Sequence, residues 1–210
     1  MHGGLSRHVG GHAMKALLLS GGIDSSALAH WTRPDICVTL DYGQQAALGE
    51  AAASRAICSE LHLEHKLISV DLSSLGSGSM AGRETALGGA APEFWPYRNQ
   101  MLVTLAAMLL QPIGLRELMI GTVATDLHAD GSVRFIQTLN ALMRLQEGCV
   151  TVTAPAQNLT STELLKLSSF PRELIGVTFS CHLHRYACGQ CSGCIKHREV
   201  VDEAFPQGTS

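Results

Sequence analysis

The sequence contains little charge, and none of its apolar runs is long. Asp, Glu, Lys and Arg make up only 16% of the 210 residues, and the formal net charge is −3. This balance gives no reason to expect nucleic acid or an anionic membrane as a partner. No stretch approaches the roughly 18 consecutive apolar residues that a membrane-spanning helix needs. Hydrophobic residues make up 46%, which predicts a soluble globular fold with a substantial core.

The first thirteen residues lack the apolar segment of a signal peptide. Met1–Ala13 instead carries four glycines and three histidines and shows no periodicity. We therefore expect a cytoplasmic protein that begins with a disordered extension over residues 1–13. A single domain is expected over residues 14–205, followed by a short tail at 206–210.

Short apolar runs alternate with helix-like segments along the chain. Each run is of a length and composition that suit a buried strand. The alternation predicts an α/β fold, a Rossmann-like parallel sheet of about five strands with helices on both faces. The expected strands are Lys15–Ser20, Ile36–Leu40, Lys66–Val70, Glu117–Ile120 and Cys149–Thr153. The expected helices are Asp24–Trp31, Gln45–Leu63, Arg98–Leu110, Val133–Gln146 and one that starts at the capping-box sequence Thr160–Glu163.

A segment rich in glycine and serine interrupts this alternation. Ser73–Pro92 contains five glycines and four serines, a composition that resists regular structure. The segment is interpreted either as a lid over a ligand or as a surface loop, and composition does not separate the two.

A candidate phosphate-binding loop, Ser20–Ser26, lies between the first expected strand and the first expected helix. Its sequence is Ser20-Gly21-Gly22-Ile23-Asp24-Ser25-Ser26. The two glycines let the backbone turn and bring N–H groups close to phosphate oxygens, and the following helix directs its positive end to the same place. The three serines add hydroxyl donors, while Asp24 could hold Mg²⁺ or cap the helix.

This loop has no lysine, so it is not a P-loop of the GxxxxGK[ST] type. It matches the SGGxDS signature of the ATP pyrophosphatases known as PP-loop enzymes, and the alternative is a tight turn that matches by chance. The resemblance implies cleavage of ATP between the α- and β-phosphates, with an adenylated intermediate.

Four of the seven cysteines are clustered near the end of the sequence. Cys181, Cys188, Cys191 and Cys194 supply the four thiolates of a closed tetrahedral Zn²⁺ site, and such a site is usually structural. The same kind of spacing also occurs in iron–sulfur proteins, so spacing does not settle the metal. The other three, Cys37, Cys58 and Cys149, are expected to be buried packing residues.

The combination of SGGIDS and the cysteine cluster resembles the QueC family, the 7-cyano-7-deazaguanine synthases. The resemblance spans residues 14 to about 205. Four further segments are similar to family motifs: Asp41–Gln44, Pro96–Asn99, Gly121 with Asp126, and Ala154–Glu163. Glu50 falls where the family carries a glutamate in the helix that follows Asp41–Gln44.

The family implies an ATP-dependent C–N ligase that releases AMP and pyrophosphate. The implied reaction adenylates the carboxylate of 7-carboxy-7-deazaguanine, forms an amide with ammonia and then removes water to give the nitrile. ATP, Mg²⁺ and Zn²⁺ are the implied cofactors, and a homodimer is the implied assembly.

Site roles follow from these matches. Asp24, Ser25 and Arg98 are the candidate catalytic residues. Arg98 could contact phosphate or the substrate carboxylate, or it is a surface arginine at a helix start. Asp126 follows a strand's carboxyl end and could bind a guanine-like base or cap its own loop. The nucleotide-binding candidates are Ser20, Gly21, Gly22, Asp24, Ser25, Ser26 and Gly121, and the substrate-binding candidates are Tyr42, Gln44, Arg98, Asn99 and Asp126.

Two segments depart from the family pattern. Gln45–Ala47 replaces the usual basic residues, and Leu127–Arg134 is shorter than its family counterpart. An alternative function follows from these changes: the activated deazapurine carboxylate would pass to an amine of a protein partner, as in QueC-like members of bacterial defence systems. A third reading is a module that binds ATP without turnover. Lys196, His197 and Arg198 are interpreted as a solvated helix face that could reach phosphates.

Overall fold

The computed structural model describes residues 13–85, 92–126 and 128–206. Within them, five strands form one sheet in the order β3-β2-β1-β4-β5, and every neighbouring pair is parallel. The predicted α/β fold with a five-stranded parallel sheet is confirmed. The strands are β1 (Met14–Leu18), β2 (Ile36–Asp41), β3 (Glu64–Ser69), β4 (Leu115–Met119) and β5 (Thr151–Thr153).

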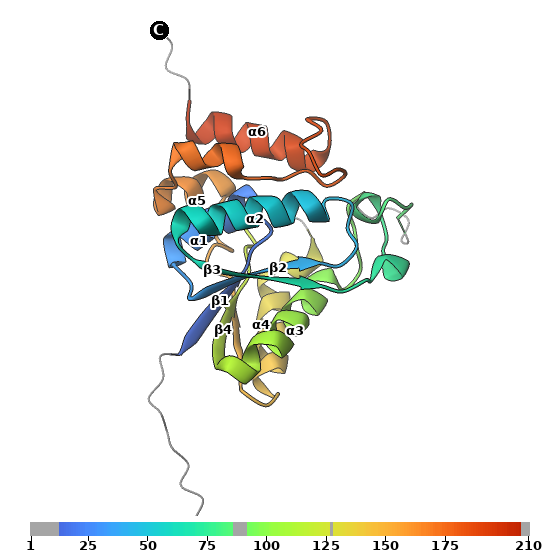
Figure 1. Cartoon of the computed structure of the whole chain (residues 1–210), viewed down its shortest axis with the longest axis vertical. Coiled ribbons are helices and arrows are strands. Elements are labelled where there is room, and N and C mark those ends of the chain that lie inside the picture. The colour runs from blue at the N-terminus through green and yellow to red at the C-terminus, as the bar shows by residue number, and fades with distance from the viewer. Residues whose placement is uncertain (1–12, 86–91, 127, 207–210) are drawn as a thin grey trace, which may run out of the picture.

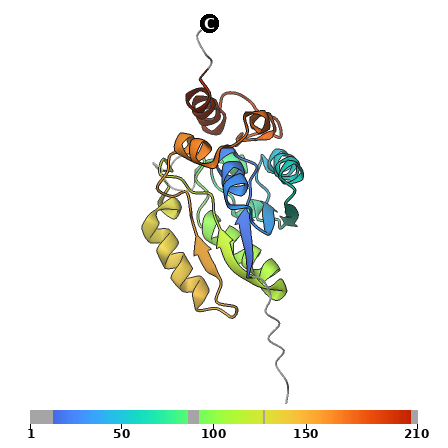
Figure 2. The same ribbon diagram turned by 90° about the vertical axis from the view of Figure 1, so that its left-hand side faces the viewer.

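Helices cover both faces of this sheet. One face carries α1, α2, α5 and α6, and the other carries α3 and α4 (Figures 1 and 2). No helix in the described part of the chain has both the length and the apolarity that a membrane crossing requires. The helices are α1 (Ile23–Thr32), α2 (Ala47–Leu61), α3 (Arg98–Leu110), α4 (Val133–Arg144), α5 (Ser161–Ser168) and α6 (Ser192–Ala204).

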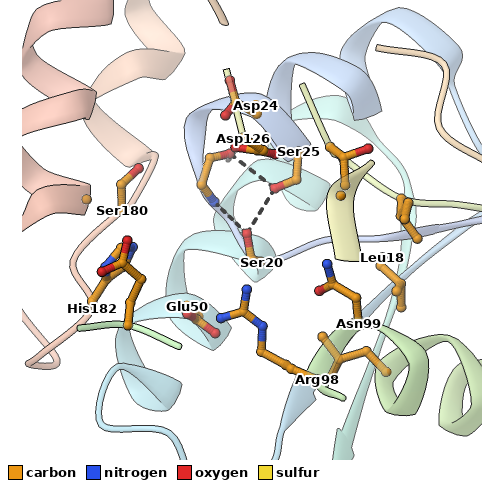
Figure 3. A pocket seen from close by; sticks show the side chains of 18 of the residues that line it. Leu18, Ser20, Asp24, Ser25, Glu50, Arg98, Asn99, Asp126, Ser180 and His182 are labelled. Atoms are coloured by element: carbon orange, nitrogen blue, oxygen red, sulfur yellow. Dashed lines mark hydrogen bonds between the residues drawn. The ribbon is translucent and has the colours of Figure 1, made fainter. Parts of the chain in front are cut away.

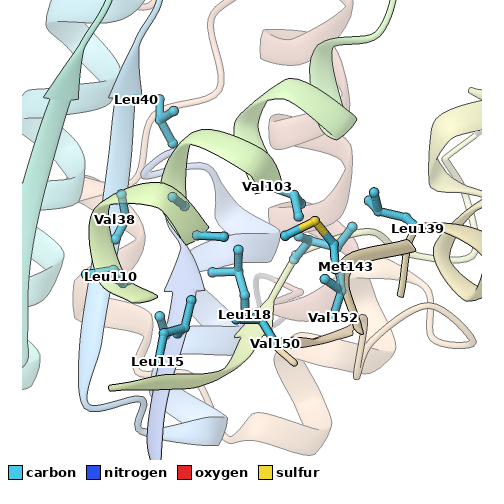
Figure 4. Packing of buried hydrophobic residues seen from close by; sticks show 14 of the residues in the cluster. Val38, Leu40, Val103, Leu110, Leu115, Leu118, Leu139, Met143, Val150 and Val152 are labelled. Carbon is cyan, nitrogen blue, oxygen red and sulfur yellow. The ribbon is translucent and has the colours of Figure 1, made fainter. Parts of the chain in front are cut away.

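Alternation along the central strand produces two apolar cores. On β1, Ala16 belongs to the core under α3 and α4, and the next residue, Leu17, belongs to the core under α1, α2 and α5. Figure 4 shows the first core, where Val103 of α3 and Leu118 of β4 pack beside Val152 of β5. Ala16 and Leu17 are both fully buried, so this part of β1 is covered on both faces, and the strand is apolar from Ala16 onward.

The strand order places the phosphate loop at a change of direction in the sheet. The chain first adds β2 and β3 on one side of β1 and then crosses to add β4 and β5 on the other side. The loops that leave β1 and β4 therefore diverge, and open α/β sheets bind ligands in the crevice at this point. The loop that ends at Ser26 and the residue Gly121 lie at these two strand ends.

Thr160 caps α5 as predicted. Its hydroxyl accepts the N–H of Glu163 and the Glu163 carboxylate accepts the N–H of Thr160. The prediction that Cys149 is buried is wrong. Cys149 is exposed and has φ of +49°, because it lies with Gly148 in the turn before β5, and the strand begins only at Thr151.

Several predictions fall partly outside the described residues. The expected extension over residues 1–13 is described only at Ala13, and of the tail only Pro206 is described. The segment Ser73–Pro92 is described to residue 85 and again at Pro92. It contains the short 3-10 turns Ser73–Leu75 and Ser79–Ala81.

Candidate active site

The phosphate loop requires glycine at its first turn. Gly21 has φ of +74°, and a Cβ there would lie 2.7 Å from the Cβ of Ala53 and 2.8 Å from the backbone nitrogen of Ser54. Both the left-handed backbone and the close approach of α2 therefore exclude a side chain. Gly121 is also tightly placed, since its Cβ would lie 3.3 Å from the Cα of Ser25.

The loop hydroxyls form a small connected group at the start of α1. Ser20 Oγ accepts the N–H of Gly22 at 3.3 Å and lies 3.2 Å from Ser25 Oγ. Ser25 Oγ lies 3.2 Å from the carbonyl oxygen of Gly22, to which it can donate. Gly22 is the N-cap of α1 and supplies no side-chain acceptor. The first N–H groups of this helix are therefore available to an anion.

Ser26 differs from the other loop residues. Its side chain is fully buried, does not line the cavity, and has no hydrogen-bond partner for its hydroxyl among the described residues. In this structure the Ser26 hydroxyl therefore cannot contact a nucleotide bound in the cavity, and the prediction that its side chain binds nucleotide is corrected.

A cavity of about 710 Å³ opens above the carboxyl ends of β1, β2 and β4. Its volume lies within the range of about 300–1,000 Å³ that is usual for ligand pockets. Figure 3 shows Ser20, Ser25 and Asp24 at one end of it and Arg98 and Asn99 at the other. Most of the predicted site residues thus meet around one space.

Two carboxylates and one ammonium group meet beside the phosphate loop. Lys196 Nζ lies 3.1 Å from Asp24 Oδ2 and 3.4 Å from Asp126 Oδ1. Asp126 Oδ2 accepts the N–H of Val123 at 3.0 Å. The remaining oxygen, Asp24 Oδ1, is buried without a hydrogen-bond partner in the described structure. An unpartnered carboxylate oxygen at this place fits a hard divalent cation such as Mg²⁺.

A second charged group lies at the far end of the cavity. Burial raises the pKa of Glu50 to about 7, against an ordinary value of 4.5. Burial also works against the charge of Arg98, but Tyr42, Asp130 and Glu50 together hold its pKa above the ordinary value. In Figure 3 the guanidinium of Arg98 points from α3 toward Glu50 on α2. Its Nη1 also lies 2.8 Å from the sulfur of Met80.

The residues around Arg98 hold it in place. Tyr42 is 4% exposed and packs edge-on against Trp95, with ring centroids 4.9 Å apart. Burial raises the pKa of Tyr42, so this phenol is neutral. Asn99, the next residue of α3, donates to the carbonyl oxygen of Asp130 at 3.4 Å. Arg98 therefore enters the cavity from a helix start that is anchored on both sides.

Gln44 lies behind the cavity wall and not on it. It is 4% exposed, its Nε2 donates to the carbonyl oxygen of Leu40 and to Glu50 Oε2, and its Oε1 accepts the N–H of Tyr42. These bonds use its amide within the protein. The predicted substrate contact of Gln44 is therefore corrected to a positioning contact with Glu50.

Several residues of the cavity wall were not among the predicted site residues. Lys196 was interpreted as part of a solvated helix face that could reach phosphates, and the structure places it against the phosphate loop. Phe179, Ser180 and His182 also line the cavity, because the chain before and after Cys181 crosses over the loop. A useful signal was present in the sequence, since all four residues lie within the cysteine segment or next to it.

The four clustered cysteines form a candidate metal centre. Their sulfur atoms all lie within 4.8 Å of one another, and two pairs are 3.9 Å apart. That separation is too long for a disulfide and close to the roughly 3.8 Å expected between sulfurs around a tetrahedral zinc ion.

Backbone N–H groups next to this cluster donate to the sulfurs of Cys188 and Cys191. Cys191 caps α6 and accepts the N–H of Cys194, and Cys188 accepts the N–H of Cys191. N–H groups of Gln190 and Cys191 lower the pKa of Cys188. The donor set of four sulfurs fits Zn²⁺ or an iron–sulfur cluster.

Comparison with known proteins agrees with this geometry. The family model described as queuosine biosynthesis protein QueC matches residues 15–205. The 7-cyano-7-deazaguanine synthase 1 of Sulfurisphaera tokodaii is 31% identical over 205 residues, which cover 91% of this chain and 94% of that protein. The 7-cyano-7-deazaguanine synthase of Pseudomonas syringae pv. syringae is 29% identical over 198 residues, which cover 85% and 86%.

Among solved structures, the U34-tRNA thiolase NcsA from Methanococcus maripaludis, determined with its [4Fe-4S] cluster, has a TM-score of 0.52 at 18% identity. The match covers 94% of this chain and 66% of that one, and it supports the fold alone. With the phosphate loop, the cysteine cluster and a family match that spans nearly the whole chain, this protein belongs to the QueC family.

Proposed function

We propose that this chain is an ATP-dependent C–N ligase that converts 7-carboxy-7-deazaguanine to 7-cyano-7-deazaguanine and releases AMP and pyrophosphate. One observation carries the proposal beyond the family match. A phosphate-binding loop and the partly buried Arg98 face each other across a single cavity of about 710 Å³. Such a cavity suits two anionic ligands, a nucleotide and a carboxylate.

The first step activates the carboxylate. A carboxylate oxygen attacks the α-phosphorus of ATP, the bond between the α- and β-phosphates breaks, and pyrophosphate leaves with the electron pair. The product is an acyl adenylate. The N–H groups at the start of α1 and the hydroxyls of Ser20 and Ser25 would stabilise the negative charge on pyrophosphate. Arg98 would hold the carboxylate for attack, since its guanidinium offers two parallel donors.

The next steps introduce nitrogen and remove water. Ammonia attacks the acyl carbon, AMP leaves, and the amide loses a proton to solvent or a nearby base. The amide oxygen then attacks the α-phosphorus of a second ATP and pyrophosphate leaves again; loss of AMP and of both protons of the amide nitrogen gives the nitrile. Glu50, with a pKa of about 7, is suited to accept or donate a proton near neutral pH.

Mg²⁺ belongs to this proposal as the partner of ATP. Asp24 and Asp126 would hold it, because Asp24 Oδ1 is a buried oxygen without a partner in the described structure. Bound there, it would neutralise phosphate charge. The cysteine centre is proposed to bind Zn²⁺ and to have a structural role. A cytoplasmic homodimer is proposed from the family resemblance.

A second candidate keeps the activation step and changes the acceptor to an amine of a protein partner. Exposure in the two altered segments supports it in part, since Gln45, Ala129 and residues 132–134 are exposed. The rest of the first segment does not, because Ala46 and Ala47 are buried. The two candidates differ in the acceptor of the activated carboxylate, ammonia or a protein amine, and analysis of the products distinguishes them.

The test is incubation of the purified protein with ATP, Mg²⁺ and 7-carboxy-7-deazaguanine, with and without ammonium, followed by mass spectrometry. The proposal expects amide and nitrile that depend on ammonium, with AMP formed at two molecules per nitrile. AMP or a trapped adenylate, without amide or nitrile in the presence of ammonium, supports a protein acceptor. Absence of AMP, pyrophosphate and adenylate under all these conditions contradicts both candidates.

A further inference from the structure

The phosphate loop of this chain contains no lysine, yet a lysine from a distant part of the sequence lies beside it. Lys196 Nζ is 3.1 Å from Asp24, which is part of the loop, and 3.4 Å from Asp126, which follows β4. Lys196 lines the same cavity as Ser20 and Ser25. A cation that is 172 residues away in sequence is thus in direct contact with the loop.

Lys196 lies on the helix that begins at the cysteine cluster. Cys191 and Cys194 lie at the first turn of α6, and Lys196 follows two residues later on the same helix. The segment before the cluster is tied to the loop as well, because Phe179 N–H donates to the carbonyl oxygen of Gly21 at 2.8 Å. Lys196 therefore extends from an ordered helix start, close to a segment that is hydrogen-bonded to the phosphate loop, unlike a lysine on a free surface.

The charges around Lys196 favour a change of its ion-pair partners when ATP binds. Without nucleotide, one ammonium group is shared by two carboxylates, and a net negative charge remains next to the place where phosphates bind. A divalent cation that arrives with ATP competes for the same two carboxylates. Lys196 is 39% exposed toward the cavity, so its ammonium group can turn to a phosphate oxygen without leaving the site.

We propose that Lys196 is a catalytic residue that exchanges Asp24 and Asp126 for oxygens of the β- and γ-phosphates of bound ATP. This proposal rests on the ATP cleavage proposed above and adds a residue to it. When the bond between the α- and β-phosphates breaks and its electron pair leaves with pyrophosphate, the ammonium group offsets the charge that develops on the leaving group. Lys196 thereby supplies from α6 the positive charge that the loop itself lacks.

The experiment compares three variants of the full-length metal-loaded protein: Lys196→Met, Lys196→Arg and Arg198→Met. Arg198 is an exposed cation on the same helix outside the cavity, so it is the matched control. Calorimetry with Mg²⁺ measures the affinities for ATP, pyrophosphate and AMP. AMP is the informative ligand because it has neither the β- nor the γ-phosphate.

Loss of one charge-assisted contact is expected to weaken ATP and pyrophosphate binding about 10- to 100-fold in Lys196→Met. AMP binding should change less than about threefold, because no lost contact reaches its phosphate. Lys196→Arg should recover most of the affinity, and Arg198→Met should bind all three ligands as the unaltered protein does.

Two results would overturn the proposal. One is Lys196→Met binding ATP and pyrophosphate with unchanged or greater affinity. The other is equal weakening for AMP with loss of bound metal, which would indicate a structural role for the side chain. Both measurements omit the deazapurine, so they are independent of the proposed substrate. A protein that binds these ligands as expected but forms no nitrile would contradict the proposed function and leave Lys196 in its role.

Discussion

The backbone N–H of Phe179 donates a hydrogen bond of 2.8 Å to the carbonyl oxygen of Gly21. Gly21 is the left-handed glycine of the phosphate loop, and Phe179 lies two residues before Cys181 of the candidate metal centre. The side-chain ion pairs of Lys196 connect the same two regions from the other side of the cysteine cluster. The candidate metal centre and the phosphate loop are therefore parts of one structural unit.

This connection predicts that loss of the metal weakens nucleotide binding. Cys188→Ser removes one of four sulfur ligands, and a structural zinc site contributes on the order of several kcal/mol to folding. We expect substoichiometric zinc by elemental analysis, a lower melting temperature and weaker ATP binding. Cys149→Ser is the control, since Cys149 is exposed and lies outside the cluster. Full ATP affinity in metal-free Cys188→Ser would show that the two sites are independent.

Comparison of Gly21→Ala with Gly114→Ala separates the steric effect of a methyl group from the backbone strain of a positive φ. A methyl group there meets Ala53 and the backbone of Ser54, and alanine must also adopt φ of +74°. We expect a loss of about 3 kcal/mol in the free energy of unfolding together with loss of ATP binding. At Gly114, φ is +103° but no atom lies within 4 Å of the Cβ position.

Gly114→Ala should therefore cost only about 1 kcal/mol and leave ATP binding unchanged. Denaturant unfolding measures both variants. Equal effects of the two substitutions would mean that the close approach of α2 to the loop does not matter.

The raised pKa of Glu50 predicts that the free energy of unfolding depends on pH. Its pKa is about 7 in the folded protein and 4.5 ordinarily, because burial disfavours the charged form. Between these values the folded chain holds a proton that the unfolded chain has lost, so stability falls as the pH rises through this window. Above about pH 7 the loss is complete and remains constant.

Glu50→Gln removes this titration and keeps an acceptor for the Gln44 amide. We expect the variant to gain stability relative to the unaltered protein by on the order of 2 kcal/mol between pH 5 and pH 8. Denaturant unfolding at both pH values measures the difference. A difference in stability that does not change with pH would show that Glu50 titrates normally.

The proposed role of Arg98 predicts that Arg98→Lys loses activity even though it keeps the positive charge. Lysine cannot reproduce the paired donors of a guanidinium. We expect Arg98→Lys to lower kcat/KM for the carboxylate substrate about 10- to 100-fold in a steady-state assay of AMP formation. Arg116→Lys, at an exposed arginine on β4 outside the cavity, should have no effect. Unchanged kcat/KM in Arg98→Lys would remove Arg98 from the proposed mechanism.

The sequence was sufficient to predict the sheet, the phosphate loop and the cysteine cluster because each depends on local patterns. Ser20–Ser26 is one continuous segment between a strand and a helix, and the four cysteines lie within fourteen residues of one another. Arg98 and Glu50 were singled out by motif, but their proximity could not be derived, since α2 and α3 lie on opposite faces of the sheet.

The errors came from long-range packing. Lys196 was interpreted as part of a solvated helix face that could reach phosphates, but nothing local shows that α6 directs it to a loop 172 residues away. Gln44 was placed on the cavity wall because it follows a strand end, yet its amide is satisfied by Leu40, Tyr42 and Glu50. Cys149 was counted as a strand residue, but it ends a turn that contains Gly148, and it is exposed there.

The central claim is that ATP activates a carboxylate by transfer of AMP, and isotope transfer tests it most directly. The substrate is 7-carboxy-7-deazaguanine labelled with ¹⁸O in both carboxylate oxygens, and the products are analysed by mass spectrometry after incubation with ATP, Mg²⁺ and ammonium. We predict one ¹⁸O in each AMP, two labelled AMP molecules per nitrile, and unlabelled pyrophosphate. Label in inorganic phosphate, or AMP without label, would contradict adenylation at this site.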